Sequence, residues 1–344
     1  MESPPGGMRL FVSLPLAPLL IVLPLSEANA LGIEDATGRR VEVPDHVARV
    51  FPAGPPAAAL LYAIAPEKLL GWPHAPGGLD RGYIARPYAK LPQLGALTSR
   101  TGEVEADALR RADPDLIVDV GTVSARYSEL ARHTQSTTGR PYILLDGRIA
   151  TMPATIRTLA RALGVEPRGE VLAAYAERVL AEVRTGVKSI PPADRLRAYY
   201  GRGKDGLTTA GPGSLGAEFM ELLGLQNVAS EDAAQMYRVT PEQIRAWKPD
   251  LLIVLGHEAA DAFRSDPLMQ ALAQHPHRFL VSPTLPFGWV DGPPSPSRLL
   301  ALRWLGAALY PGRFPEDMRS ATRDFYRLFY QVDLTDAQLD ELLR

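Results

Sequence analysis

The sequence predicts an α/β fold in which two parallel-sheet lobes are joined by one long helix, with a ligand cleft between the lobes. The chain of 344 residues is longer than a single hydrophobic core usually supports. A helix–strand–glycine unit occurs once in each half, and a long amphipathic segment separates the halves. We therefore expect a signal segment at 1–30, an N-terminal lobe at 31–150, connecting helices at 151–190 and a C-terminal lobe at 191–344.

The repeated unit is found by shifting the sequence by 135 residues, which places 104–121 on 239–256 with six of eighteen positions identical. In each copy a short amphipathic helix is ended by a proline, Pro114 or Pro249. An apolar run that ends in glycine follows. Such short, continuous apolar runs are typical of parallel strands covered on both faces. The two copies predict the same substructure in both lobes.

Further apolar segments alternate with helical ones, which is the pattern of parallel α/β sheets. Including the two repeat strands, we expect strands at Arg49–Pro52, Leu69–Trp72, Leu116–Val120, Tyr142–Leu145, Leu196–Tyr200, Leu251–Leu255 and Arg278–Val281.

The connecting region predicts two helices. Thr151 is placed to cap the first, which ends before Gly164, and the second runs from about 167 to 188. At 1.5 Å per residue the second is about 32 Å long. Its expected apolar stripe recurs at every fourth position: Val171, Tyr175, Val179, Val183 and Val187. A single helical joint favours rocking of the lobes by a few degrees over wide hinge closure.

The first 30 residues predict a secretory signal peptide. Arg9 precedes an apolar run from 10 to 25, and small residues follow at Ala28 and Ala30. A membrane anchor is the alternative, but three prolines interrupt the run and it is shorter than the ~20 apolar residues that a span needs. We expect cleavage between Ala30 and Leu31.

The absence of cysteine excludes disulfides, a lipid anchor on a cysteine and thiolate-ligated metals. An exported chain without a lipid anchor favours the periplasm. The formal net charge of −2 gives no indication of a nucleic-acid partner. We expect a soluble monomer.

Ligands of open α/β sheets bind beyond the carboxyl ends of the strands. The repeat pairs Gly121-Thr122 with Gly256-His257, and we expect these two loops to face each other across the cleft. The strand-end loops are rich in arginine, which binds oxyanions through its planar fork, and in aromatic residues. Surface arginines and packing aromatics are the alternative interpretation. The candidate ligand contacts are Trp72, Arg81, Tyr83, Arg86, Tyr88, Thr122, Arg148, Arg202, Tyr237, Arg238, His257, Trp289 and Asp291.

The segment Phe287–Ser295 carries two of these candidates. Its two prolines, Pro293 and Pro294, stiffen the loop and would hold Trp289 and Asp291 in place for a ligand. The alternative is a tryptophan packed on its own lobe.

Other chemistries have little support in the sequence. No two histidines are spaced i,i+4 on a helix, so no direct metal ligation is predicted, although His74 and His257 could meet across the cleft. Ser214 lies among glycines but lacks the Gly-x-Ser-x-Gly spacing, and no phosphate-binding loop or dinucleotide fingerprint occurs. We expect no catalytic residue and no cofactor; a periplasmic hydrolase or lyase is the alternative from another class.

These segments, in their order along the chain, resemble the periplasmic substrate-binding proteins of ABC importers, in the helix-backbone class for iron-siderophores, haem and cobalamin. The resemblance is carried by Asp35–Pro44, Arg49–Tyr62, Gly71-Trp72, both Pro-Asp-strand units, and Phe287–Ser295 with Arg298. The last of these is similar to a subgroup that binds iron complexes and whose relatives include binders of molybdate and tungstate.

The resemblance implies delivery of a ligand to an inner-membrane ABC permease. The first hypothesis is a ferric siderophore or a similar metal complex, which needs a wide, shallow aromatic cleft. The second is molybdate or tungstate, which needs a small buried pocket with donors from both lobes. The class also implies one acidic side chain per lobe that docks on the permease, here Glu103 or Glu105 and Glu218 or Glu221.

Overall fold

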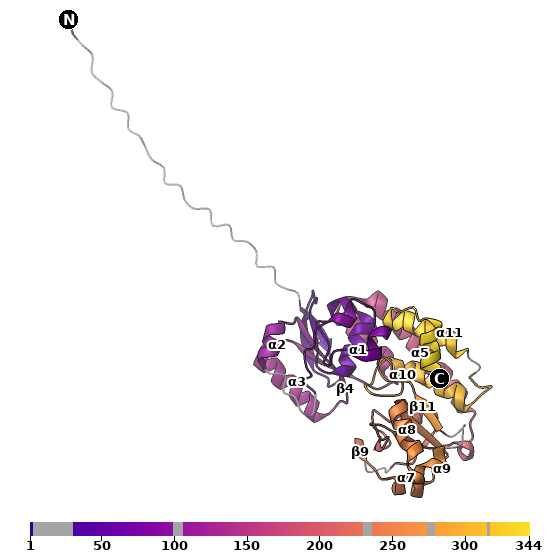
Figure 1. The fold of residues 1–344 in the computed structure, drawn as a ribbon. Coiled ribbons are helices and arrows are strands. Elements are labelled where there is room, and N and C mark those ends of the chain that lie inside the picture. The colour runs from indigo at the N-terminus through magenta and orange to yellow at the C-terminus, as the bar shows by residue number, and fades with distance from the viewer. Residues whose placement is uncertain (3–29, 99–105, 230–235, 274–278, 315–316) are drawn as a thin grey trace.

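The computed structural model describes residues 1–2, 30–98, 106–229, 236–273, 279–314 and 317–344. Two α/β lobes lie one beside the other, with α5 and the C-terminal helices along one side of the pair (Figure 1). This arrangement confirms the predicted fold class. The predicted signal segment falls almost entirely on residues 3–29, which are outside the described ranges.

The N-terminal lobe contains a parallel sheet with the strand order β3-β4-β5. Its strands are β3 (Val50–Pro52), β4 (Leu116–Gly121) and β5 (Tyr142–Asp146), and an antiparallel ribbon precedes them, β1 (Ala30–Glu34) with β2 (Arg40–Pro44). Its helices are α1 (Pro55–Ile64), α2 (Ala106–Ala112) and α3 (Ala125–Thr138), with short 3₁₀ turns η1 (Pro66–Lys68), η2 (Gly78–Tyr83) and η3 (Tyr88–Lys90).

The second lobe contains a parallel sheet with the order β11-β10-β6-β8. Its strands are β6 (Arg197–Gly201), β8 (Gln226–Asn227), β10 (Leu251–Leu255) and β11 (Phe279–Ser282), beside the antiparallel pair β7 (Thr208–Ala210) and β9 (Met236–Arg238). Its helices are η4 (Pro192–Asp194), α6 (Glu218–Leu222), α7 (Pro241–Trp247), α8 (Gly256–Ser265) and α9 (Pro267–Ala273).

The predicted repeat is confirmed, because the repeat strand is central in both sheets: β4 lies between β3 and β5, and β10 lies between β6 and β11. The similarity extends to the Pro-Asp pairs. The Asp115 carboxylate accepts hydrogen bonds from the amides of Ala48 and Arg49, both at 2.8 Å. The Asp250 carboxylate accepts one from the amide of Arg197 at 3.0 Å. In each lobe this aspartate fixes the start of the neighbouring strand.

The connecting helices α4 (Met152–Ala162) and α5 (Glu166–Lys188) agree with the prediction, and Gly164 follows α4 with φ +66°. Two details were wrong. Thr151 does not cap α4 through its side chain, because its hydroxyl donates to the carbonyl of Arg148 at 3.3 Å. Val171 is 53% exposed. On a helix of 3.6 residues per turn a four-residue spacing drifts by about 40° per step, so Val171 lies off the face that buries Tyr175 and Val179.

The predicted strand Leu69–Trp72 does not form. Leu69 and Trp72 make isolated parallel bridges to two different segments, at Val50 and Gln93, and the Trp72 amide donates to the Pro92 carbonyl at 2.8 Å. Gly71 permits this close approach, since a Cβ there would lie 2.4 Å from the same carbonyl oxygen.

The C-terminal segment was assigned to the second lobe by its place in the chain, but it also contacts the first. It comprises α10 (Ser297–Leu309), α11 (Met318–Phe325), the π-helical turn η5 (Tyr326–Tyr330) and α12 (Asp336–Leu343). The Tyr330 ring stacks on Tyr62 with centroids 5.9 Å apart, and Gln338 Nε2 donates to the Gly82 carbonyl at 2.8 Å. One continuous core therefore contains buried residues of both lobes.

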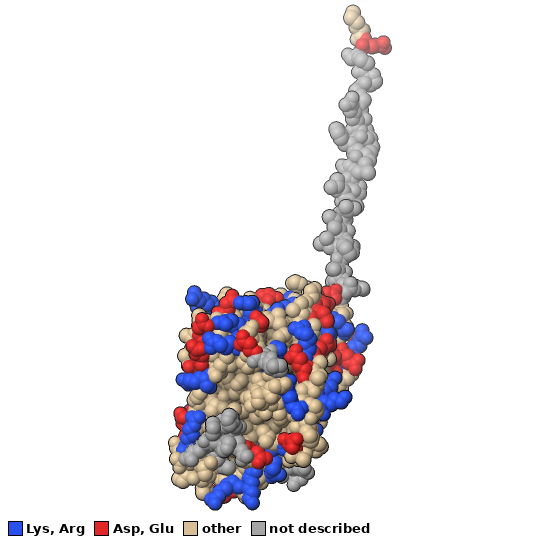
Figure 2. All heavy atoms as spheres, turned by 90° about the vertical axis from the view of Figure 1, so that its right-hand side faces the viewer, with Lys and Arg blue, Asp and Glu red and all other residues tan. Residues whose placement is uncertain are grey.

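Lys and Arg are interleaved with Asp and Glu on the face shown in Figure 2, around a central area without charged side chains. No helix within the described ranges is long and apolar enough to cross a membrane.

Asp119 on β4 gives a test of the fold through pH. Burial raises the pKa of this carboxyl to about 6, although the Tyr142 hydroxyl donates to it at 3.1 Å. A folded-state pKa above the unfolded value of 3.8 gives stability that is present below about pH 4 and is lost as pH rises through 6.

Asp119→Asn is therefore expected to flatten the pH dependence of the free energy of unfolding between pH 4 and 6. At pH 7.5 the variant should be more stable by up to about 3 kcal/mol. Urea denaturation measures both effects, with the exposed Asp45→Asn as control. An unchanged slope between pH 4 and 6 would contradict the assignment.

Candidate ligand-binding site

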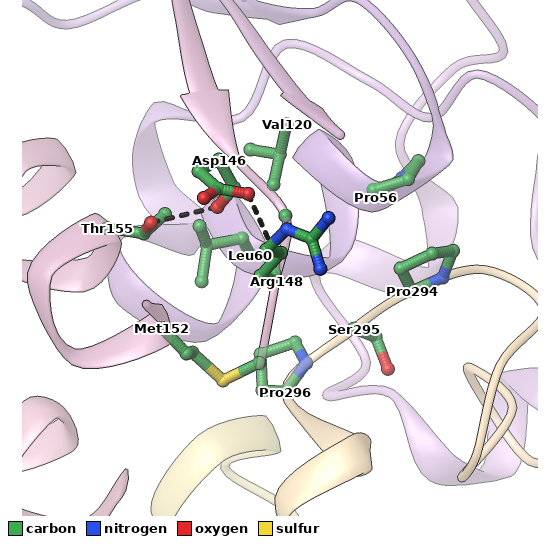
Figure 3. A pocket seen from close by; sticks show the side chains of 11 residues that line it. Pro56, Leu60, Val120, Asp146, Arg148, Met152, Thr155, Pro294, Ser295 and Pro296 are labelled. Carbon is green, nitrogen blue, oxygen red and sulfur yellow. Dashed lines mark hydrogen bonds between the residues drawn. The ribbon is translucent and has the colours of Figure 1, made fainter. Parts of the chain in front are cut away.

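A small pocket lies where the first sheet meets the second lobe (Figure 3). It is formed by the carboxyl ends of β4 and β5, the first turns of α1 and α4, and the loop before α10. Its cavity of about 20 Å³ has room for a water molecule. The lining residues are Pro56, Leu60, Val120, Asp146, Gly147, Arg148, Met152, Thr155, Pro294, Ser295 and Pro296.

The turn after β5 forms the polar side of this pocket. The Gly147 amide donates to the Gly121 carbonyl at 2.9 Å, and a Cβ at Gly147 would lie 2.9 Å from the Gly121 Cα, so glycine is required for this approach. The Asp146 carboxylate accepts from the Arg148 amide at 3.0 Å, and the Asp146 carbonyl accepts from the Thr155 hydroxyl at 2.8 Å. The turn that carries Arg148 is therefore held by hydrogen bonds to the end of β4 and to the first turn of α4.

The Arg148 guanidinium points over the pocket, away from Asp146 (Figure 3). Its Nη2 donates to the Gly213 carbonyl of the second lobe at 3.1 Å. Among the described residues, no carboxylate lies within ion-pair distance of Arg148, and the side chain is exposed. Its positive charge is available to an anion that enters between the lobes.

The glycine-rich loop opposite Arg148 is fixed by its own hydrogen bonds. The Ser214 hydroxyl donates to the Gly211 carbonyl at 2.6 Å and accepts from the Ala217 amide at 3.3 Å, which fixes the turn before α6. The Gly213 amide donates to the Glu221 carboxylate at 2.5 Å. The Gly213 carbonyl is thereby held toward the first lobe.

A second arginine lies at the carboxyl end of the second sheet. Arg202 Nη1 is 3.0 Å from Asp291 Oδ2, which also accepts from the Tyr200 hydroxyl at 2.8 Å. Burial lowers and Asp291 raises the pKa of Arg202, with a net increase. Asp291 itself is buried and pairs with Arg202, whose side chain is 31% exposed; a ligand contact of Asp291 stays a prediction.

The family model for periplasmic binding proteins matches residues 58–276, more than half of the chain. The chain belongs to this family. The predicted role, the solute-binding component of an ABC import system, is confirmed at this level.

Two relatives of this periplasmic binding protein match it over almost their whole length. The molybdate-binding protein MolA of Haemophilus influenzae is 24% identical over 93% of this chain and 96% of its own. The structure of MolA bound to molybdate has a TM-score of 0.74 at 20% identity, covering 89% of this chain and 99% of MolA. An ABC transporter solute binding protein from Sulfurospirillum deleyianum has a TM-score of 0.80 at 26% identity, covering 92% and 99%.

Three aromatic candidates are packed inside the periplasmic binding protein, and their ligand contacts stay predictions. Trp289 is 0% exposed, and its Nε1 donates to the Tyr326 hydroxyl at 3.2 Å. Trp72 is buried and donates to the Tyr88 carbonyl at 2.8 Å. Tyr83 is buried with its ring 6.0 Å from Tyr326. Their large apolar area stabilises the packing between elements.

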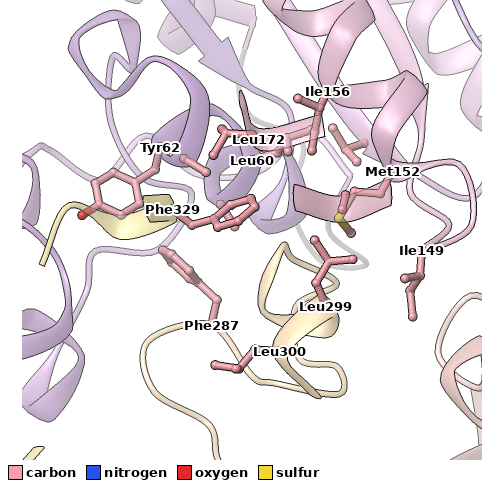
Figure 4. Packing of buried hydrophobic residues seen from close by; sticks show 14 of the residues in the cluster. Leu60, Tyr62, Ile149, Met152, Ile156, Leu172, Phe287, Leu299, Leu300 and Phe329 are labelled. Carbon is pink, nitrogen blue, oxygen red and sulfur yellow. The ribbon is translucent and has the colours of Figure 1, made fainter. Parts of the chain in front are cut away.

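The segment Phe287–Ser295 connects the lobes. Figure 4 shows Phe287 beside Tyr62 and Phe329. The Phe287 ring lies 5.8 Å from Trp72 and 6.1 Å from Tyr62, both in the first lobe. The end of this segment, rather than Trp289, borders the pocket.

The remaining arginine and tyrosine candidates do not line the pocket. Arg81 and Arg86 are exposed, Arg81 donating to the Pro76 carbonyl at 2.8 Å, and Tyr88 packs on Tyr62. Tyr237 is half-buried, and Arg238 pairs with Asp205 at 2.6 Å.

The paired loops of the repeat contain Thr122, which is exposed after β4, and His257. His257 lines another pocket with Thr284 and Glu341. Within the described ranges no three His, Asp or Glu side chains gather as a metal site.

The glutamates that were predicted to dock on a permease fall into three groups. Glu103 and Glu105 lie outside the described residues, and Glu221 is exposed. Glu218 is buried and accepts hydrogen bonds from the amides of Ile149 at 2.7 Å and Ala150 at 3.0 Å. Its carboxylate is enclosed between the lobes, which favours Glu221 over Glu218 for the predicted contact with a permease.

Arg298 is the residue that the sequence did not identify as part of the site. It is fully buried in α10 and contacts Glu218 at 3.3 Å. Burial lowers the pKa of Arg298, and the Glu218 carboxylate opposes this change. One signal was present: Arg298 is the sole charged residue among the first apolar residues of α10, next to Leu299 and Leu300.

Trp289→Ala is expected to lower the free energy of unfolding by about 3–5 kcal/mol, because it leaves a cavity and removes the hydrogen bond that Trp289 donates to the Tyr326 hydroxyl. Urea denaturation measures this loss. The exposed Thr122→Ala is the control, with an expected change within about 0.5 kcal/mol. If the variant keeps its free energy of unfolding but loses affinity for the ligand, Trp289 contacts the ligand and this packing role is wrong.

Proposed function

We propose that this periplasmic binding protein captures a small tetrahedral oxyanion of the molybdate or tungstate type and delivers it to an inner-membrane ABC permease. The observation that carries the proposal is the Arg148 guanidinium, which extends over a small pocket lined by both lobes and has no carboxylate partner within the described ranges. Arginine donates two parallel hydrogen bonds to oxyanions. The same pocket lies at the first turn of α1, where a helix dipole favours negative charge.

The iron-chelate hypothesis has less support. A chelate needs a wide aromatic surface, but Trp72, Tyr83 and Trp289 are used in packing. The pocket of about 20 Å³ would have to widen even for a tetrahedral oxyanion, and much further for a chelate. MolA, a relative that matches 93% of this chain, is a molybdate-binding protein.

The mechanism that follows is capture without chemistry. The anion is held by Arg148 and by the loops that face it, and it is released when the permease separates the lobes. Among the residues that line the pocket, Asp146 is the single carboxylate and Arg148 the single cationic side chain. An arginine does not act as a proton acceptor, so this pocket gives no support to a hydrolase or lyase. The relatives named above are binding proteins, and no catalytic residue or cofactor is part of the proposal.

We further propose export to the periplasm with cleavage between Ala30 and Leu31, action as a monomer without a nucleic-acid partner, and docking through Glu221 and through Glu103 or Glu105. The β1 strand begins at Ala30, which is compatible with a mature chain that starts at Leu31.

Thermal shift and calorimetric titration test the ligand class with molybdate, tungstate, vanadate, ferric siderophores, haem and cobalamin. The expected result is a raised melting temperature with molybdate and tungstate and none with the chelates. A shift with a ferric siderophore and none with the oxyanions would contradict the proposal.

Arg148→Ala is expected to weaken molybdate binding at least about tenfold, because a charge-assisted hydrogen bond contributes about 1.5–3 kcal/mol. Calorimetric titration measures the change. Arg184→Ala removes an exposed arginine of α5 that does not line the pocket and serves as the matched control, with unchanged affinity expected. Equal losses in both variants would indicate non-specific attraction to positive charge.

A further inference from the structure

A buried ion pair in the second lobe holds the loop that carries Arg148. Arg298 of α10 and Glu218 of α6 are 3.3 Å apart, and their side chains are 0% and 5% exposed. A buried pair of this kind is weak grounds for a role in stability, since apolar side chains of similar volume often stabilise as well. Its hydrogen bonds to backbone indicate another role.

The pair contacts the backbone of the first lobe on both sides of Arg148. Arg298 Nη1 donates to the Gly147 carbonyl at 2.9 Å. The two oxygens of Glu218 accept from the amides of Ile149 at 2.7 Å and Ala150 at 3.0 Å. These three hydrogen bonds fix the residues before and after Arg148 but leave its side chain free to extend over the pocket.

The same guanidinium also holds the opposite side of the pocket mouth. Arg298 Nη2 donates to the Leu215 carbonyl at 2.6 Å, in the loop that contains Gly213. The Gly213 carbonyl is the acceptor for Arg148 at 3.1 Å. Arg298 therefore sets the separation between the two backbones that Arg148 bridges, which an apolar side chain could not do.

We propose that Glu218 and Arg298 are positioning residues for ligand binding. They fix the direction of the Arg148 guanidinium and the width of the pocket, and they raise the affinity for the anion without touching it. The proposal rests on the proposed function, in which Arg148 binds the oxyanion. It replaces the predicted permease-docking role of Glu218.

The test uses the full mature chain with Glu218→Gln and with the paired change Glu218→Leu and Arg298→Met, which removes both buried charges together. The paired variant is expected to fold, and its affinity for molybdate should fall about tenfold. In an Arg148→Ala background the same paired change should alter affinity less than twofold, because there is no guanidinium left to position. Equal losses in both backgrounds, or full affinity in Glu218→Gln, would overturn the proposal.

A ligand-free measurement separates this proposal from the proposed function. Hydrogen exchange at the Ile149 and Ala150 amides should become at least tenfold faster in the paired variant. If the wild-type chain binds no oxyanion, the proposed function fails, and unchanged exchange at these amides would independently contradict the positioning role. The exposed pair Asp261 and Arg264, 3.3 Å apart, is replaced by Leu and Met as the matched control, with no change expected.

Discussion

Arg298 and Glu218 form a buried ion pair. Their hydrogen bonds join the two lobes beside the pocket where we expect the ligand. A charge removed from water must find partners, and this pair finds them in each other and in three backbone groups of the turn after β5. In our proposal the width of the pocket and the direction of Arg148 depend on that contact. It also explains why an arginine occurs among the apolar residues at the start of α10.

The lobes are joined by more than the connecting helix α5. The C-terminal helices place Tyr330 on Tyr62, and Phe287 of the second lobe packs on Trp72. A joint with this much shared core favours a small widening of the pocket over a wide closing motion of the lobes. Donors that are already held in place reduce the ordering that a small ligand must otherwise bring about on binding.

Much of the fold could be predicted because it depends on local patterns. Apolar runs, a proline that ends a helix and a repeated glycine identify β4 and β10 without knowledge of the rest of the chain. The place of Arg148 beside the pocket could also be predicted, because it lies in the turn that follows a strand end. The aromatic candidates could not, since their burial depends on distant partners: Trp289 and Tyr326 are 37 residues apart, and Tyr62 and the Tyr330 carbonyl that it contacts are 268 apart. The role of Glu218 depends in the same way on Ile149 and Arg298.

We propose that an oxyanion binds beside Arg148, under the loop at 294–296. A crystal structure of the mature chain with tungstate, with anomalous data at a tungsten absorption edge, tests this binding site most directly. We expect one strong anomalous peak within hydrogen-bond reach of the Arg148 guanidinium. A peak at Arg202 alone, or no peak from crystals grown at saturating tungstate, would contradict it.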